Sequence, residues 1–272
     1  MKLMTLNTHS LVEADYPCKL KAFVSAAAEE LPDIIALQEV NQSISSEEAA
    51  AAGLQNFTYC GAIPVKADNH AYNAVKMLSE KGAGYYWTWL GIKEGYGKYD
   101  EGISLLSRSP IIETDTVTVS STDDYRSWKT RRVIGVRTQN HPDTWFYSVH
   151  LGWWEDKEEP FSKQWERLNN HIRNKGRVWL MGDFNSPADK RDEGYDLIKD
   201  SRFFDSFLLA KRRDSGVTAV GKIDGWTESN EMRIDHIWCS EKADVLSSTV
   251  IFNGKKYPVI SDHYGVIIET KD

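Results

Sequence analysis

Polar side chains that can bind metal or move protons stand where short apolar runs of this sequence end. Asn7 ends the first run, Glu39 ends the second, and Asp183 follows a third. Because apolar runs are buried, the polar groups at their ends should open onto one rim. Carboxylates gathered at a rim repel one another unless a proton or a cation relieves the repulsion. Their oxygens are ligands that Mg²⁺ or Mn²⁺ prefers, so the pattern predicts a divalent metal site.

The same placement recurs further along the chain. His150 ends an apolar run, Asn185 lies two residues after Asp183, and Asp235 lies inside another run. Asp262 and His263 follow the last run. Each residue alone has an ordinary explanation, as a solvated loop carboxylate, a turn residue or a buried histidine. Their order along the chain is what indicates catalysis.

The order of these motifs resembles the endonuclease/exonuclease/phosphatase superfamily. That superfamily includes DNase I-like nucleases, abasic-site endonucleases, neutral sphingomyelinases and inositol-polyphosphate phosphatases. The resemblance implies an α/β fold, a four-layer α/β/β/α sandwich, with residues 1–272 as a single catalytic domain. The segments that carry it are Asn7, Gln38-Glu39, Gly102–Arg108 (GISLLSR), His150-Leu151, Gly182–Asn185 (GDFN), Arg233–Ile237 (RIDHI) and Ser261–His263 (SDH).

The resemblance also implies a metal-assisted attack of water on a phosphate ester. Glu39 would be the principal metal ligand, with Asn7 beside it and Asp262 supporting the metal shell. Asp183 would position or deprotonate the attacking water. Asn185 would hydrogen-bond the phosphate or the nucleophile. Mg²⁺ or Mn²⁺ is therefore the expected cofactor.

Two histidines complete the set that the resemblance implies. His263 would donate to a phosphoryl oxygen, with its ring oriented by Asp235. That pairing should raise the histidine's pKa and favour the donor form. His150 would be a second imidazole at the phosphate, as in the DNase I-like branch; the abasic-site branch has no histidine there.

Residues near these motifs suggest how substrate is bound. Arg131 and Arg132 precede a strand and either bind phosphate or form an exposed charged turn. Trp153 and Trp154 follow His150, and Trp226 precedes Asp235. Flat rings of this kind stack on nucleobases or cover the apolar face of a sugar.

The aromatic segment 82–101 allows two interpretations. It is either a hairpin whose rings fill a core or a glycine-hinged loop that brings Tyr99 to a ligand. The acidic run 155–159 would repel a phosphodiester backbone and could accept hydrogen bonds from sugar hydroxyls. The sequence is also similar in general appearance to the bacterial maltose 6′-phosphate phosphatase branch. We therefore expect a phosphatase for a phosphorylated sugar such as maltose 6′-phosphate; the alternative is a nuclease or other phosphodiesterase of the same fold.

Strands and a few helices must position these residues. Leu20, Phe23, Val24, Ala27 and Leu31 share one helical face that ends before Pro32, and 161–174 repeats that spacing. The expected strands are Lys2–Leu6, Asp33–Gln38, Gly102–Ser107, Arg132–Arg137, Thr144–Val149, Arg177–Met181 and Arg233–Trp238.

Composition limits the classes of molecule that this protein is expected to bind. Lys and Arg number 33 against 40 Asp and Glu, a net charge of −7, which disfavours a protein that coats nucleic acid. The three cysteines are widely spread and form no CxxC motif, which is typical of reduced thiols in a cytosol. The sequence has no signal-peptide pattern and no long apolar run. We therefore expect a cytoplasmic protein that acts on a small molecule, without a membrane partner.

Overall fold

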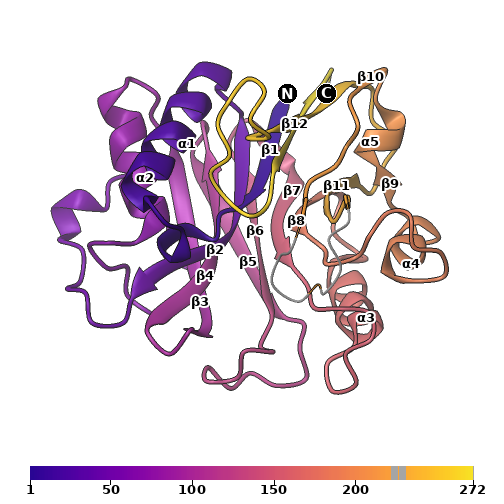
Figure 1. Cartoon of the computed structure of the whole chain (residues 1–272), viewed down its shortest axis with the longest axis horizontal. Coiled ribbons are helices and arrows are strands. Elements are labelled where there is room, and N and C mark those ends of the chain that lie inside the picture. Colours follow the sequence, from indigo (N-terminus) through magenta and orange to yellow (C-terminus); the bar gives the residue numbers. More distant parts are fainter. Residues whose placement is uncertain (222–225, 227–230, 272) are drawn as a thin grey trace.

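The computed structural model describes residues 1–221, 226 and 231–271. Within these residues, two β-sheets pack face to face, and helices cover the outer face of each sheet (Figure 1). This is the four-layer α/β/β/α sandwich that the motif order predicted. Both chain ends lie near the same edge of the molecule (Figure 1).

The first sheet contains the two N-terminal strands. Its described strands follow the order β10-β12-β13-β1-β2-β4-β3. β1 and β2 run parallel, with Asn7 beside Gln38, so the polar ends of both strands reach the same rim. The strands are β1 (Lys2–Asn7), β2 (Ile34–Ser43), β3 (Tyr86–Gly95), β4 (Tyr99–Ser107), β10 (Arg212–Arg213), β12 (Val245–Ile251) and β13 (Gly265–Thr270).

The second sheet carries most of the other motifs. Its described strands follow the order β5-β6-β7-β8-β11-β9, and β7 runs parallel to β8. The strands are β5 (Ile111–Thr118), β6 (Arg132–Thr138), β7 (His141–His150), β8 (Arg177–Asp183), β9 (Phe204–Asp205) and β11 (Asp235–Cys239).

The helices form the outer layers. α1 and α2 pack on the first sheet, and α3 and α4 pack on the second (Figure 1). The helices are α1 (Tyr16–Glu30), α2 (His70–Glu80), α3 (Phe161–Ile172), α4 (Gly194–Lys199) and α5 (Ser206–Leu209), with short 3₁₀ turns at Ser10–Val12 and Ala51–Gly53. None of the described helices is long and apolar enough to cross a membrane.

Each boundary between layers is a separate apolar core. Leu3, Ile103 and Phe146 lie between the two sheets. Phe23 lies under α1 on one side, and Trp165 lies under α3 on the other. The strands between two such cores are apolar on both faces, which explains why β1, β2 and β8 read as continuous apolar runs.

One sequence expectation needs correction at this level, and one open alternative can be decided. Leu31 does not share the buried face of α1, because it follows the helix with a left-handed backbone (φ 48°) and is 38% exposed. Most of the aromatic segment is the β3–β4 hairpin, as the first of the two interpretations had it. Trp87 and Trp89 are buried in the core, and only Tyr96, at the turn, is largely exposed.

Candidate active site

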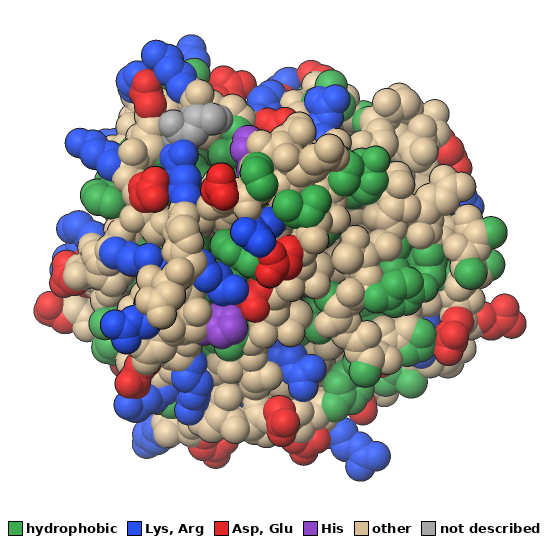
Figure 2. Space-filling model, turned by 180° about the vertical axis from the view of Figure 1, so that it is seen from behind, with side chains coloured by type: hydrophobic (Ala, Val, Ile, Leu, Met, Phe, Trp, Pro, Cys, Tyr) green, Lys and Arg blue, Asp and Glu red, His purple; other side chains and the backbone are tan. Residues whose placement is uncertain are grey.

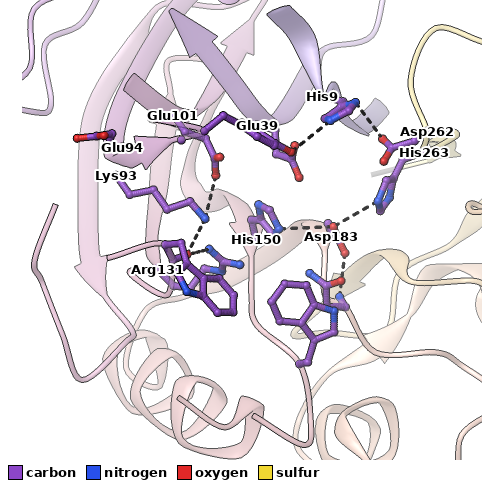
Figure 3. A pocket seen from close by; sticks show the side chains of 15 residues that line it. His9, Glu39, Lys93, Glu94, Glu101, Arg131, His150, Asp183, Asp262 and His263 are labelled. Carbon is purple, nitrogen blue, oxygen red and sulfur yellow. Dashed lines mark hydrogen bonds and ion pairs between the residues drawn. The ribbon is translucent and has the colours of Figure 1, made fainter. Parts of the chain in front are cut away.

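A cavity of about 250 Å³ lies where the polar ends of β1, β2, β7 and β8 converge (Figure 3). Among the residues that the structure describes, five carboxylates, two cations and three histidines line it. The lining residues are His9, Glu39, Lys93, Glu94, Gly95, Tyr96, Glu101, Trp128, Arg131, His150, Trp153, Asp183, Asn185, Asp262 and His263.

Strand register brings three of the predicted residues together. His150 at the end of β7 lies beside Asp183 at the end of β8, and Asp235 at the start of β11 lies on its other side. Gly182 permits this close packing: its φ is 154°, and a Cβ there would lie 1.9 Å from the carbonyl oxygen of Val149. The GDFN motif therefore fixes where Asp183 projects.

Asp183 stands at the centre of the site. Its Oδ2 accepts a hydrogen bond from the amide of Asn7 (3.1 Å), and its Oδ1 accepts one from the backbone N–H of Asn185 (2.8 Å). Burial raises its pKa to about 6, with Asp235 adding to the effect and His263 opposing it. A carboxylate with such a pKa can accept a proton near neutral pH.

The two predicted histidines approach the same oxygen of Asp183. Nε2 of His150 lies 3.6 Å from Oδ2 and Nε2 of His263 lies 3.8 Å from it (Figure 3). Both distances are too long for direct hydrogen bonds. The three groups are therefore spaced to hold an oxygen atom of water or phosphate between them.

Different surroundings give the two rings different charges. Burial lowers the pKa of His263, but Asp235, whose Oδ2 lies 2.9 Å from Nδ1, and Asp183 outweigh it and raise that pKa well above its usual value. Burial, Arg131 and Lys93 hold the pKa of His150 well below its usual value. His263 is thus the charged ring, as the sequence predicted, and His150 is the neutral one.

The acidic side of the cavity centres on Glu39. Its Oε1 accepts a hydrogen bond from the amide of Asn7 (2.9 Å), which links it to Asp183. Glu39 has a left-handed backbone (φ 50°) at an irregularity in the β2–β4 pairing, and this turns its side chain to the rim. Burial, Glu101 and Asp262 raise its pKa to about 7.

This donor set fits a divalent cation. Among the described lining residues, five carboxylates stand against one lysine and one arginine. Burial and then repulsion from Glu101 and Asp262 raise the pKa of Glu39, and an oxygen-preferring cation would stabilise its charged form. In the described residues, His9, Glu13 and Asp262 also place one ligand atom each within 4.8 Å of one another, as do Asp183, Asp235 and His263. In the second group, His263 and Asp235 are already hydrogen-bonded to each other.

The sequence reasoning missed several lining residues. His9 follows Asn7 by two positions; its Nδ1 lies 2.8 Å from Glu13 and 3.8 Å from Asp262. Lys93 and Glu101 lie opposite each other across the β3–β4 hairpin and form an ion pair of 3.1 Å. The register of the hairpin brings this pair together, and the residue types alone give no signal of that register.

Some expected binding residues lie elsewhere. Arg132 lines a different, shallow pocket, because it begins β6 and points away from Arg131 along the strand. Trp154 packs against Phe161 of α3, and the Tyr99 hydroxyl donates to the carbonyl of Leu11. Trp226 does not line the cavity itself, but its indole N–H reaches the Asn185 amide oxygen at 3.4 Å.

The amide of Asn185 is itself engaged with the protein. Its nitrogen donates to the carbonyl of Leu151 (2.9 Å), so this side chain braces the loop after β7 as well as lining the cavity.

The acidic run 155–159 does not line the cavity either. Asp156 forms an ion pair with Lys129 (2.8 Å). Glu159 is buried and accepts hydrogen bonds from the backbone of Ser121 and Thr122. The run therefore anchors the 120–130 loop instead of offering a row of free acceptors. Trp128 in that loop is 55% exposed and lies 5.9 Å from Trp153, ring centre to ring centre.

Residues 4–263 match the endonuclease/exonuclease/phosphatase family. The chain belongs to this family, whose members are hydrolases that act on phosphate esters. No curated protein matches the chain.

Solved structures of several family proteins are similar along the whole chain. A family protein from Leptotrichia buccalis is 27% identical, with 100% of both chains covered and a TM-score of 0.88. The mannosyl-6-phosphatase Bt3783 of Bacteroides thetaiotaomicron is 18% identical, with 99% of both chains covered and a TM-score of 0.67. The 3′ phosphatase NExo from Neisseria, bound to a product DNA hairpin, is 19% identical, with 100% of both chains covered and a TM-score of 0.63. At these last two identities the likeness concerns the fold.

Proposed function

We propose that residues 1–272 form one catalytic domain, a Mg²⁺- or Mn²⁺-dependent phosphatase that releases inorganic phosphate from a phosphorylated sugar. The observation that carries the proposal is the convergence of Asp183, His150 and His263 on one point of a cavity rimmed by Glu39 and Asp262. Hydrolysis of a phosphate ester needs a base for water, hydrogen-bond donors for the phosphoryl oxygens and compensation of negative charge. This site has a group for each task.

The roles follow from the charges of the side chains. Asp183 accepts the proton of the attacking water, because its pKa of about 6 leaves it largely ionised at neutral pH. His263, held in the charged form by Asp235, donates from Nε2 to a phosphoryl oxygen. His150 is neutral and donates a hydrogen bond from its own Nε2 to a phosphoryl oxygen.

Glu39 and Asp262 would hold the divalent ion, with the Asn7 amide fixing the Glu39 carboxylate. When bound, that ion supplies positive charge for the phosphate oxygens. The amide of Asn7 also donates a hydrogen bond to Asp183, so this one side chain fixes the position of the Glu39 carboxylate relative to the base.

Aromatic rings at the mouth favour a sugar as the leaving group. Trp128 and Trp153 line the cavity and contact each other with ring centres 5.9 Å apart, so together they offer an apolar ring surface on which a carbohydrate can pack. The described lining of the cavity holds five carboxylates and two cations, unlike a groove built to follow a nucleic-acid backbone. On the face of the molecule drawn in Figure 2, Lys and Arg side chains are likewise interspersed with Asp and Glu. The likeness in fold to a mannosyl-6-phosphatase is consistent with this choice.

Phosphate release from a panel of sugar phosphates tests the proposal directly. The panel should include maltose 6′-phosphate, a hexose 6-phosphate and a nucleotide 3′-phosphate, each with Mg²⁺, with Mn²⁺ and with EDTA. We expect release from a sugar phosphate that EDTA abolishes and added metal restores. Equal rates in EDTA would refute the metal requirement. Nicking of plasmid DNA without release from any sugar phosphate would favour the nuclease alternative.

A further inference from the structure

Two buried cations line the cavity on the side away from His263 (Figure 3). Lys93 on β3 is 7% exposed, and Arg131, directly before β6, is 4% exposed. Nζ of Lys93 and Nη1 of Arg131 donate to the same acceptor, the carbonyl oxygen of Trp128, at 2.9 and 3.1 Å. One backbone oxygen thus fixes both cations and ties them to the loop that presents the Trp128 ring.

This pair carries more positive charge than its direct partners compensate. Lys93 has an ion-pair partner in Glu101 at 3.1 Å. Within the described residues, the guanidinium of Arg131 donates hydrogen bonds to backbone carbonyls and to no side chain. Its Nε is buried and has no hydrogen-bond partner among these residues. Burying two like charges side by side is costly unless an anion joins them. The arrangement is therefore one that an incoming anion would complete.

We propose that Lys93 and Arg131 form an anion subsite that reads the second negative charge of a phosphate monoester and so selects monoesters over diesters. This inference rests on the proposed phosphatase function. A monoester carries up to two negative charges and three terminal oxygens, whereas a diester carries one charge and two such oxygens. Lys93 keeps Glu101 as a partner with either ligand, but a diester brings one charge and one terminal oxygen fewer to the two cations and therefore binds them less strongly.

The roles within the pair differ. Arg131 presents a planar fork that can bind two phosphate oxygens at once, whereas Lys93 acts as a point charge. Lys93 is already paired with Glu101, so its substitution removes one charge from the subsite and leaves the Arg131 fork in place. Lys93 is therefore the specificity-determining residue to test.

Binding of two ligands that cannot turn over provides the test. Methylphosphonate carries two charges in mildly alkaline buffer, and its monomethyl ester carries one. Both would be titrated calorimetrically, with saturating Mg²⁺, into the wild-type protein and the Lys93→Met variant. We expect the wild type to prefer the doubly charged ligand. We expect Lys93→Met to weaken that ligand by about 10- to 100-fold, the range of one charge-assisted hydrogen bond, and to leave the ester's affinity nearly unchanged.

Two further variants protect the test against indirect effects. Lys93→Met leaves Glu101 buried without its partner, so the double variant Lys93→Met/Glu101→Gln restores neutrality without restoring the cation. It should show the same loss of preference. Lys98→Met removes an exposed lysine from the turn of the same hairpin and should leave both affinities unchanged.

Several outcomes would overturn the inference. It fails if the wild type shows no preference, if neither ligand binds, or if Lys93→Met or the double variant weakens both ligands equally. It also fails if preference survives in both variants. The outcome is separate from that of the sugar-phosphate panel, because a preference lost on removing Lys93 would stand even if no sugar phosphate in the panel were hydrolysed.

Discussion

The two histidines beside Asp183 lie at nearly the same distance from its carboxylate but differ in charge, because His263 is charged and His150 is neutral. Their Nε2 atoms lie 3.6 Å (His150) and 3.8 Å (His263) from the same carboxylate oxygen, and both rings are buried. Behind His263 stands Asp235, which raises its pKa despite burial. Around His150 stand Arg131 and Lys93, which together with burial lower its pKa.

The comparison shows that the carboxylate shared by both rings does not by itself set their charges, because Asp183 raises the pKa of His263 together with Asp235 whereas His150 stays neutral beside the same carboxylate. The residues that differ behind each ring set the difference between them. The cavity thus offers a charged donor beside a neutral donor, and a phosphoryl group between them would receive positive charge from one side only. Substitutions in matched pairs can test this difference.

The largest effect should come from the shared residue itself. Asp183→Asn removes the proposed base, and we expect turnover of a sugar phosphate to fall by about 10²–10⁴-fold, the value of general base catalysis. Steady-state phosphate release measures this. Thermal unfolding of the same variant should show a folded protein. Near-normal turnover in a folded Asp183→Asn variant would mean that Asp183 is not the base and that the two histidines do not act together with it in catalysis.

The next effect separates the two rings directly. His263→Gln removes a charged donor, and His150→Gln removes a neutral one. We expect turnover to fall by about 10- to 100-fold for His263→Gln, the value of a hydrogen bond from a charged donor. We expect a loss of only about 3- to 10-fold for His150→Gln, the value of a neutral hydrogen bond. Comparing kcat for the two variants checks this, and equal losses would contradict the assigned difference in charge.

Much of this site could be predicted from sequence because its residues end buried strands. Asp183, His150 and Asp235 lie on adjacent strands in register, so their meeting follows once the sheet order is known. His263 and Asp262 were assigned through the family resemblance that the terminal SDH motif helps to carry. The same resemblance, carried by the order of the motifs, implied the four-layer sandwich.

The basic side of the cavity could not be predicted in the same way. Lys93 reaches the site through the register of the β3–β4 hairpin, which places it opposite Glu101. Trp128 reaches it through the 120–130 loop. Glu159 accepts a hydrogen bond from the backbone of that loop, and Asp156 forms an ion pair with its Lys129. Such placement depends on strand pairing and loop anchoring, which residue types alone do not reveal. Arg132 and Trp154 were misplaced for the same reason: each adjoins a residue that does line the cavity.

A smaller effect should follow from the residue behind His263. Asp235→Asn removes the charge that raises the pKa of His263, and that pKa should fall toward or below the ordinary value of about 6.5. A raised pKa stabilises the fold at pH values below the unfolded-state pKa, and this contribution is lost as the pH rises through the folded-state pKa. Asp235→Asn should therefore cost most stability in mildly acidic buffer.

Histidine resonances followed by NMR across pH in the metal-free protein would measure this shift. His150 serves as the internal control, because the main causes of its lowered pKa, which are burial, Arg131 and Lys93, stay in place. It should remain neutral throughout the neutral range in both proteins. A His263 ring that titrates near its ordinary value in the wild type would remove the basis of the comparison.

The smallest effect concerns binding rather than proton transfer. Trp153 lines the cavity, whereas its neighbour Trp154 packs against Phe161 of α3. Trp153→Leu should raise KM for a disaccharide phosphate by about 5- to 10-fold, roughly the worth of one ring-stacking contact, and leave kcat nearly unchanged. Trp154→Leu should leave KM unchanged and lower the unfolding temperature instead. With phenyl phosphate, which has no sugar, the KM of Trp153→Leu should rise less than it does with the disaccharide phosphate. An equal rise would mean that the ring contacts the phosphate group rather than the sugar.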